Sequence, residues 1–388
     1  MSEKRFHVAD EREIRRGRVT DVYFERTRRI LEAKGLDPHV TMEAAARSVP
    51  RGDWAVFCGL QEALELLKGL PLDVWALPEG TLFRPGEPVL LISGNYREFC
   101  VYETALLGLL CQASGIATQA ARCAIAAEGR PVVHFGARRV HPAIAPMVER
   151  AAFVGGCAGV STLVGGELLG EEPVGTIPHA LVLILGDAAS ASLAFDEVIE
   201  GSVERVALVD TFGDEKFEAL ECAELLEGSI YAVRLDTAAS RRGDLLAIAK
   251  EVRWELDLHG YSDVKIFLSG GLTEDDLPVL NEVADAYGIG TAISAARAVD
   301  FGLDIVEIDG EPVAKRGKAS GAKQLHLCPE CGYRKVTLLA EQNVPCPRCG
   351  TEMEPKLVLF LENGDLVRDL PSPQQIREYV RSQWPDSL

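Results

Sequence analysis

Apolar and polar positions alternate along this chain in patterns whose period changes twice. Residues 20–35 carry one apolar stripe with charged residues opposite it, and Gly35 follows the stripe, so we predict a helix there. Residues 53–70 are expected to run from a strand into a second amphipathic helix. Residues 74–96 hold short apolar runs separated by Pro-Glu-Gly and Arg-Pro-Gly-Glu-Pro turns, which is typical of antiparallel hairpins. The pattern therefore predicts a first domain of mixed helices and strands over residues 1–115.

After residue 115, strand-like apolar runs begin to alternate with helical stretches. These runs are expected to form strands at 131–137, 203–212, 229–237, 263–272 and 286–294. The later runs follow one another at intervals of about 25 to 35 residues, which suits βα units whose parallel strands are buried on both faces. A glycine-rich piece at 155–166 is expected to supply another strand-to-helix turn. We predict an α/β domain over residues 116–300 whose strands form a closed or partly closed barrel.

The last part of the chain, residues 301–388, has a small basic linker and two Cys-x-x-Cys pairs. The pairs are separated by fourteen residues and consist of Cys328, Cys331, Cys346 and Cys349. This spacing is typical of a zinc ribbon, in which four thiolates close the coordination sphere, so we predict a structural Zn²⁺ site. Two redox-active pairs or plain disulfides are the alternative. An apolar run at 356–367 contains Asn-Gly, which predicts a hairpin.

The composition argues against nucleic acid and membrane as binding partners. The 388 residues carry a formal net charge of −19, which argues against non-specific binding of nucleic acid. The N-terminus has no basic segment followed by an apolar one, and the apolar run at 180–185 is too short to cross a membrane. We therefore expect a cytoplasmic protein that binds neither nucleic acid nor membrane. A local basic cluster in such an acidic chain indicates a pocket for a small anionic ligand.

Chemically versatile residues gather where the predicted strands end, and the chemistry of barrels lies at the carboxyl ends of their strands. The candidates are Phe135, Arg138, Arg139, Asp210, Arg234, Asp236, Asp244, Ser269, Gly270, Gly271, Gly290 and Thr291. Any one of them has an ordinary structural interpretation, such as an aspartate that caps a helix. Together, arginine forks and glycine turns can grip phosphate, and aspartates can hold ribose hydroxyls or Mg²⁺. The set predicts a phosphorylated sugar as ligand.

A further helix is expected after residue 175. Pro178 suits its first turn and Thr176 is the expected cap, which would place His179 in the first turn near the strand ends. On ordinary base rates a histidine at a helix start is polar surface.

The order of several short motifs resembles a known family. The motifs are TDVYFE, FGARR, GTIPHA, GDAASASLAFDE, LVDTFGDEKFEAL, VRLDT with RRGD, FLSGGL and GIGT. In this order they resemble nicotinate phosphoribosyltransferases of the compact type with a C-terminal zinc knuckle. The resemblance implies an α/β fold with an incomplete α/β barrel, an N-terminal open-faced α/β sandwich and a small zinc-ribbon domain. It also implies a homo-oligomer in which a neighbouring subunit completes each active site.

The implied reaction joins nicotinate to phosphoribosyl pyrophosphate (PRPP), giving nicotinate mononucleotide and pyrophosphate for NAD biosynthesis. Phe135 resembles the aromatic residue that stacks on the pyridine ring, and Tyr23 the one that a partner subunit adds. Arg138 and Arg139 resemble the anchors for pyrophosphate and for the base carboxylate.

The remaining roles follow from the same resemblance. Arg234 and Asp236 resemble a pair near the base and the ribose, and Ser269, Gly270, Gly271, Gly290 and Thr291 resemble a 5′-phosphate cradle. His179 matches a histidine that is phosphorylated when ATP hydrolysis is coupled to the reaction. Mg²⁺ is expected with PRPP.

Three points stay open at the level of the sequence. The family's usual DSGD motif reads here as Asp236-Thr237 with Asp244 later, so the roles of the two aspartates are not divided. The base could be nicotinamide or quinolinate, although a second arginine favours an acidic base and quinolinate calls for a denser basic pocket. A non-catalytic zinc-ribbon binding protein is the alternative from another class.

Overall fold

The computed structural model describes residues 6–226, 229–237, 240 and 243–385. Contacts within the chain divide it into two compact units. Residues up to 118 together with 297–383 form the first unit, and residues 119–296 with 384–388 form the second. The division at 115 and 300 with a third domain over 301–388 stays a prediction from the sequence pattern.

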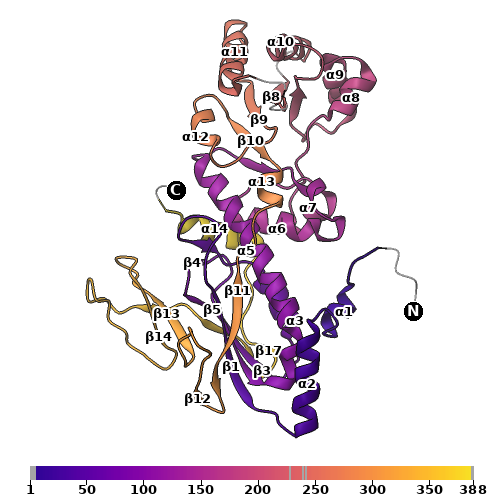
Figure 1. Ribbon diagram of the computed structural model, residues 1–388. Coiled ribbons are helices and arrows are strands. Elements are labelled where there is room, and N and C mark those ends of the chain that lie inside the picture. The colour runs from indigo at the N-terminus through magenta and orange to yellow at the C-terminus, as the bar shows by residue number, and fades with distance from the viewer. Residues whose placement is uncertain (1–5, 227–228, 238–239, 241–242, 386–388) are drawn as a thin grey trace. The chain divides into compact units, whose positions relative to one another are not determined.

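The first unit is built on a seven-stranded sheet with strand order β12-β11-β1-β5-β3-β16-β17 (Figure 1). The strands and helices up to residue 126 are α1 (Glu11–Arg15), α2 (Val22–Lys34), β1 (His39–Ala46), β2 (Ala55–Val56), α3 (Leu60–Leu67), β3 (Leu72–Ala76), β4 (Leu82–Phe83), β5 (Pro88–Asn95), α4 (Tyr96–Phe99), η1 (Cys100–Tyr102) and α5 (Glu103–Ala126). The elements after residue 300 are β11 (Phe301–Ile308), β12 (Glu311–Pro312), β13 (Lys323–Leu327), β14 (Arg334–Leu338), β15 (Glu354–Pro355), β16 (Val358–Glu362), β17 (Asp365–Leu366) and α14 (Pro373–Ser382).

The large sheet is antiparallel and one face carries its core. Strand β1 pairs with β5 on one side and with β11 on the other, and β16 pairs with β3. Apolar residues of α3 and of the first turns of α5, such as Leu64 and Leu106, pack with strand residues such as Leu90 and Leu361. The predicted helix over 20–35 is α2, which ends at Gly35 with φ 66°. The predicted antiparallel hairpins are confirmed by the pairing of β3 with β5 and of β16 with β17.

Helix α5 is the most apolar long helix of the described chain. With the turns before it, residues 96–126 are long and apolar enough, by length and composition alone, to cross a membrane. However, 56% of its most apolar window is buried inside the fold, as in the core helix of a protein that spans no membrane. Just over half of this window therefore packs within the fold.

The second unit is built on a five-stranded parallel sheet with strand order β6-β10-β9-β8-β7. Its elements are β6 (Val132–His134), η2 (Ala137–Arg139), η3 (Pro142–Ile144), α6 (Ala145–Gly155), α7 (Leu163–Leu169), α8 (His179–Leu185), α9 (Ala188–Val198), β7 (Arg205–Leu208), α10 (Glu215–Leu225), β8 (Ile230–Leu235), α11 (Leu245–Leu258), β9 (Lys265–Leu268), α12 (Leu277–Leu280), β10 (Ala286–Ile289) and α13 (Thr291–Ser294). Each predicted strand of this region is present. A parallel bridge from Gly159 to Val133 on β6 precedes α7, which confirms the expected strand-to-helix turn.

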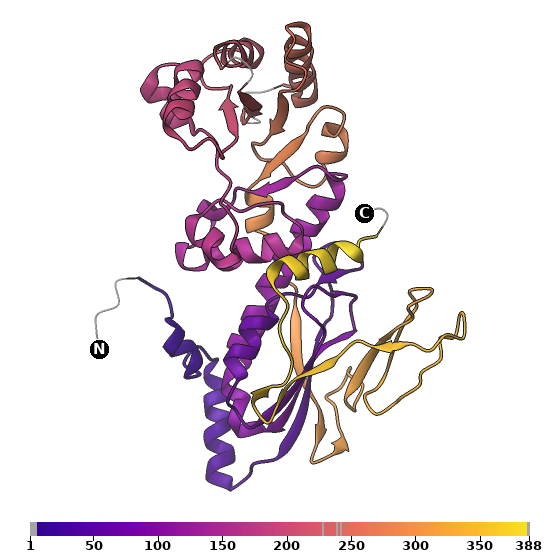
Figure 2. The ribbon, with the colours of Figure 1, turned by 180° about the vertical axis from the view of Figure 1, so that it is seen from behind.

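A small three-stranded sheet, β14-β13-β15, carries the four cysteines at its turns. Figure 2 shows its hairpin from behind, beside β11 and β12. Arg334 on β14 makes a two-pronged contact with Glu87, from Nε to Oε1 at 2.6 Å and from an amino nitrogen to Oε2 at 2.7 Å. With the antiparallel sheet and the parallel α/β unit, this module confirms the predicted fold class.

Glu103 makes the stability of the first unit depend on pH. Burial, together with the nearby carboxylate of Asp304, raises the pKa of this carboxyl to about 7. A raised carboxyl pKa favours the folded state at low pH, and this contribution is lost as the pH rises through 7. We expect Glu103→Gln to match the wild type at about pH 4 and to exceed it by about 3 kcal/mol at pH 8 in urea unfolding. The exposed Glu98, changed to Gln, is the control; an equal gain there would contradict the assignment.

Candidate functional site

Two adjoining cavities open at the carboxyl ends of the parallel strands of the second unit. Their volumes are about 450 and 340 Å³. Both are lined by Phe135, Arg138, Arg234 and Asp236. The first is completed by Ser161 and residues 174–176 and 178–180, and the second by Arg139 and residues 269–273, 288 and 290–292. Most residues expected from the sequence thus line one continuous site.

Arg234 is the most firmly held cation of this site. It lies on β8 with a side chain only 15% exposed. Its Nε donates to Ser269 Oγ at 2.9 Å, one amino group donates to Thr176 Oγ1 at 2.6 Å, and the other lies 3.2 Å from Asp236 Oδ2. Ser269 Oγ in turn donates to Asp236 Oδ1 at 2.7 Å. The guanidinium is therefore fixed before any ligand enters.

This arrangement corrects the expectation for Thr176. The sequence predicted that it caps the following helix, but the cap position of α8 is Pro178. The hydroxyl of Thr176 instead accepts a hydrogen bond from Arg234. Thr176 still lines the first cavity, as a residue that holds an arginine.

Phe135 directly follows β6 and places a ring on the wall of both cavities. The Arg234 guanidinium lies 5.1 Å from the ring centroid, and the Phe267 ring is stacked at 5.7 Å. A Cβ on Gly288 would come within 2.5 Å of the Phe135 ring, so only glycine on β10 allows this position. A flat ligand ring has a preformed aromatic surface here.

Arg138 and Arg139 follow on the short turn η2. Arg138 lines both cavities and Arg139 lines the second. Among the described residues, no carboxylate lies within ion-pair distance of either guanidinium. Two cations beside an aromatic ring are thus left for an anionic ligand.

The glycine turns form the far wall of the second cavity. Gly270 and Gly271 both have positive φ, 93° and 76°, and a Cβ on Gly270 would lie 2.9 Å from the Asp236 carbonyl oxygen. Gly290 and Thr291 open α13 at the end of β10 and line the same cavity. Backbone turns of this kind can approach a phosphate closely.

His179 and Asp210 form a pair at the first cavity. His179 Nε2 lies 3.2 Å from Asp210 Oδ1, with side chains 41% and 2% exposed. Asp210 was open to interpretation as a helix cap, yet its Oδ2 accepts from Asp236 N and from Thr237 Oγ1. Burial raises the pKa of Asp210, and His179 counteracts this. The buried carboxylate holds the more exposed imidazole.

Two expected site residues lie elsewhere. Asp244 caps α11, because its Oδ1 accepts from Leu246 N and Ala247 N. Its neighbours Arg241 and Arg242 lie outside the described residues. Tyr23 belongs to α2 of the first unit, where its side chain is 55% exposed. The ligand-binding roles of Asp244 and Tyr23 stay predictions.

Sequence reasoning missed a buried polar group behind the cavity wall. His134 and Glu149 are both fully buried and face each other, and Glu149 also holds Ser161 of the first cavity. A signal was present: Glu149 falls on the apolar side of a helix among Val148, Ala151 and Ala152. A charge in that position indicates a buried partner.

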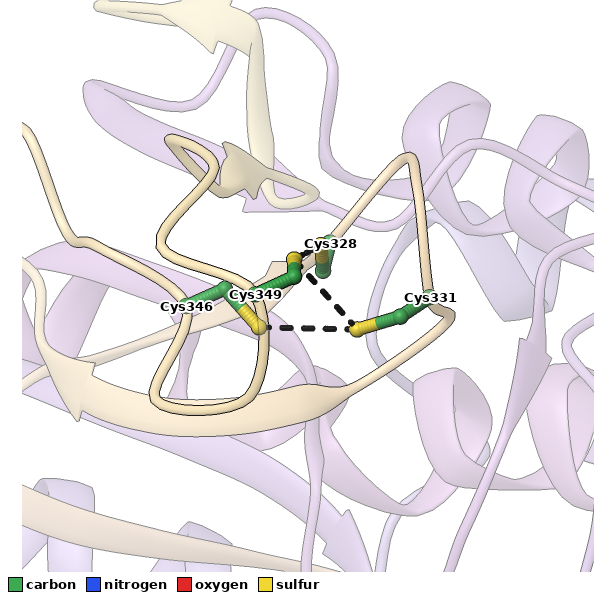
Figure 3. A group of neighbouring side chains, drawn as sticks. All are labelled: Cys328, Cys331, Cys346 and Cys349. Carbon is green, nitrogen blue, oxygen red and sulfur yellow. Dashed lines mark hydrogen bonds between the residues drawn. The ribbon is translucent and has the colours of Figure 1, made fainter.

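The four cysteines form a candidate metal centre (Figure 3). Their Sγ atoms all lie within 4.8 Å of one another, and three pairs are separated by 3.4, 3.5 and 3.7 Å. Tetrahedral zinc with Zn–S bonds of about 2.3 Å places its sulfurs about 3.8 Å apart. The sulfur positions fit such an ion, which would hold both turns together.

Two family models match this chain. The model described as "Quinolinate phosphoribosyl transferase, N-terminal domain" matches residues 21–114. The model described as "Quinolinate phosphoribosyl transferase, C-terminal domain" matches residues 116–304. Together they cover the antiparallel sheet of the first unit up to β11 and nearly all of the second unit.

Individual proteins are also similar. Nicotinate phosphoribosyltransferase pncB2 of Mycobacterium tuberculosis is 33% identical over 325 residues, covering 80% of this chain and 68% of that protein. The crystal structure of nicotinate-nucleotide pyrophosphorylase from Pyrococcus furiosus has a TM-score of 0.96 and 52% identity, covering 98% of both chains. The crystal structure of human nicotinic acid phosphoribosyltransferase shares the fold, with a TM-score of 0.77 and 22% identity over 94% of this chain and 93% of that one.

Proposed function

Because this chain belongs to the type II phosphoribosyltransferase family, which transfers a phosphoribosyl group to a pyridine base in NAD biosynthesis, we propose that its base is nicotinate. The pyridine nitrogen attacks the anomeric carbon of PRPP. The N–C bond forms as the bond from that carbon to the pyrophosphate oxygen breaks, and pyrophosphate leaves with the electron pair. The product is nicotinate mononucleotide.

One observation carries the choice of base. An aromatic ring, Phe135, adjoins two arginines, Arg138 and Arg139, that no carboxylate of the described chain neutralises. Arg138 and Arg139 are both exposed, so an unpaired guanidinium costs little here, but a neutral nicotinamide offers neither of them an anionic group. The carboxylate of nicotinate would pair with one arginine and pyrophosphate with the other. The name of the mycobacterial relative agrees with this choice.

The remaining side chains suit a reaction that depends on position and charge. Positive charge develops on the ribose as pyrophosphate leaves, and Asp236 lies beside the fixed Arg234 to stabilise it. The glycine turns at 270–271 and 290–291 would hold the 5′-phosphate. Holding both reactants in line removes much of the entropic barrier. No covalent link to the protein is needed.

We propose that the reaction also uses Mg²⁺, bound with PRPP, and ATP. Asp236 is engaged by Arg234 and Ser269, and Asp210 by His179, so neither carboxylate is left to bind a metal alone. We therefore place Mg²⁺ on the pyrophosphate oxygens of PRPP. His179 has a partly exposed ring beside the cavity, which makes it the candidate to accept a phosphoryl group from ATP.

Quinolinate is the second candidate, because both matching family models carry its name. It has two carboxylates, and its conversion to the same mononucleotide also releases CO₂. Among the described residues only Arg138, Arg139 and Arg234 bring guanidinium groups to the two cavities, and Arg234 is already paired. That set suits one carboxylate and a pyrophosphate better.

A product assay tests the proposed function. The protein is mixed with Mg²⁺, PRPP and nicotinate, nicotinamide or quinolinate, with and without ATP, and the mononucleotide is measured by mass. We expect product from nicotinate without CO₂ release. Product from quinolinate with stoichiometric CO₂ would transfer the assignment to the second candidate, and no product from any base would refute the transferase activity on pyridines. Stimulation by ATP would support the role of His179.

Arg139→Ala should distinguish the two uncommitted arginines. We expect it to weaken nicotinate binding about tenfold or more and PRPP binding by no more than about threefold, because a lost charge-assisted contact is worth about 1.5–3 kcal/mol. Calorimetric titration of each substrate measures both. The reverse pattern would assign the base carboxylate to Arg138.

The proposal includes assembly. Tyr23 is exposed on α2, and we propose that in a homo-oligomer it covers the base bound by a neighbouring subunit. Mixing Tyr23→Ala subunits with Arg139→Ala subunits tests this, since mixed oligomers would regain some sites with neither change. No recovery would assign Tyr23 to its own subunit or to none.

A further inference from the structure

The second unit contains a buried polar chain that runs directly behind the wall of the second cavity. His134, the last residue of β6, is fully buried, and its Nε2 lies 2.8 Å from Ser294 Oγ. On the other side, its Nδ1 lies 3.8 Å from Glu149 Oε1, and Glu149 is also fully buried. The imidazole is thus hydrogen-bonded to the hydroxyl on α13, and its second nitrogen lies within ion-pair distance, but not hydrogen-bond distance, of the carboxylate on α6; we call these three side chains the polar chain.

Glu149 extends this chain to a third segment. Its Oε1 accepts from Ser161 N at 2.8 Å, Ser161 Oγ at 3.0 Å and Thr162 N at 3.1 Å, and its Oε2 accepts from Thr162 Oγ1. Burial alone would raise the pKa of Glu149, but the neighbouring His134 and these hydrogen bonds lower it below the ordinary value. The carboxylate is therefore ionised at neutral pH and fully occupied by donors.

Each member of the chain adjoins a different part of the ligand site. His134 immediately precedes Phe135 and the turn that carries Arg138 and Arg139. Ser294 closes α13, whose first residues line the second cavity, and its backbone N donates to Gly290 O at 3.1 Å. Ser161 lines the first cavity.

Glycines pack closely against the side chains of this polar chain. A Cβ on Gly136 would lie 1.8 Å from Ser294 Oγ and 2.7 Å from His134 Nε2. A Cβ on Gly165 would lie 1.9 Å from Glu149 Oε2. Glycines at both ends thus let the backbone close tightly on the polar side chains, which fixes the spacing between the three segments.

Stability alone is a poor reason for this arrangement. A buried carboxylate and imidazole lose their hydration, and an apolar pair of similar volume is often neutral or more stabilising. The ends of β6 and β10 are already joined by the sheet, in which Phe135 N donates to Ile289 O at 2.9 Å. The polar chain adds a directional side-chain link beyond this last backbone hydrogen bond, where the two turns leave the sheet.

We infer that His134, Glu149 and Ser294 are positioning residues that set the distance between the arginine turn at 135–139 and the glycine turn at 290–294. The inference rests on the proposed function, in which PRPP places its pyrophosphate at the arginine turn and its 5′-phosphate at the glycine turns. A ligand that reaches both turns depends on their spacing, whereas a fragment that occupies one turn does not.

Three ligands distinguish a change in the spacing between the two turns from a change within either turn. Inorganic pyrophosphate reports on the arginine turn, ribose 5-phosphate on the glycine turns, and PRPP on both at once. Dissociation constants are measured by calorimetry with Mg²⁺ for the wild type, Ser294→Ala and Glu149→Gln, two changes that preserve side-chain volume closely. Tyr287→Phe is the matched control, because it removes a buried hydrogen bond to Asn281 from β10 of the same sheet without touching either cavity.

We expect Ser294→Ala and Glu149→Gln each to weaken PRPP binding tenfold or more while both fragments change by less than about threefold, and Tyr287→Phe to change none of the three. If the binding of pyrophosphate and ribose 5-phosphate weakens as much as that of PRPP, the polar chain has only a structural role and the inference is overturned. Unchanged PRPP binding in both variants would overturn it too. A wild type that binds no PRPP would refute the proposed function itself, and the inference with it.

Discussion

Arg234→Met should lower kcat/KM for phosphoribosyl transfer by about a thousandfold. The side chain links Asp236, Ser269 and Thr176 and lies against the Phe135 ring, so its loss leaves a partly buried carboxylate without its cation. Truncating one partner of such a pair costs about 2–5 kcal/mol, and about 4 kcal/mol corresponds to a thousandfold. Steady-state kinetics with nicotinate and PRPP measures the change.

Two lysine variants distinguish the effect of the Arg234 charge from the effect of its planar shape. Arg234→Lys restores the charge but not the planar fork, so we expect it to recover only about tenfold of the loss. Arg253→Lys makes the same change at an arginine that donates to the carbonyls of Tyr261 and Val264, and it should leave kcat/KM within about twofold. Near-full activity of Arg234→Lys would show that the fork geometry is unimportant.

Cys346→Ser should remove the metal and unfold the small sheet β14-β13-β15. Wild-type protein is expected to hold one zinc per chain by elemental analysis, and the variant almost none. Structural zinc contributes on the order of 10 kcal/mol to the folding of a small module, far more than its few buried apolar residues, Val344 and Met353 among them, can supply. Hydrogen exchange should therefore lose protection over 323–355.

Cys111→Ser provides the control, since this thiol lies on α5 outside the cluster. Wild-type protein without metal, whose thiols instead titrate as two disulfides, would favour the redox interpretation. Deleting residues 324–388 would not test the metal site alone. That deletion also removes β16 and α14, whose Ile376 and Val380 pack against Gly80.

Local patterns predicted the elements of both units well because each depends on neighbours in the sequence. Period and turn residues predicted α2 with Gly35 at its end, and Asn363-Gly364 predicted the β16–β17 turn, where both residues have positive φ. The alternation of strands and helices after residue 115 predicted the parallel sheet. The spacing of the cysteines predicted their convergence.

These local patterns did not predict which distant segments of the chain contact each other. Nothing in the apolar run at 301–308 indicates that it pairs with β1, some 260 residues earlier. Thr176 matched a helix cap, but its partner Arg234 is 58 residues away. His134 interrupts an apolar run and has partners on two other elements, so its role depends on tertiary contacts alone.

The seven-stranded sheet has a consequence for synthesis on the ribosome. Strands β1, β3 and β5 are complete by residue 95, but β16 begins only at residue 358, and β11 at 301. At about 5–20 residues per second, the roughly 260 intervening residues take about 13 to 50 s to emerge. During that time the early strands expose unpaired edges, whereas the five parallel strands between residues 132 and 289 are all synthesised before β11 begins. We expect the second unit to fold first, and the nascent N-terminal strands to be the segment that chaperones must protect from aggregation.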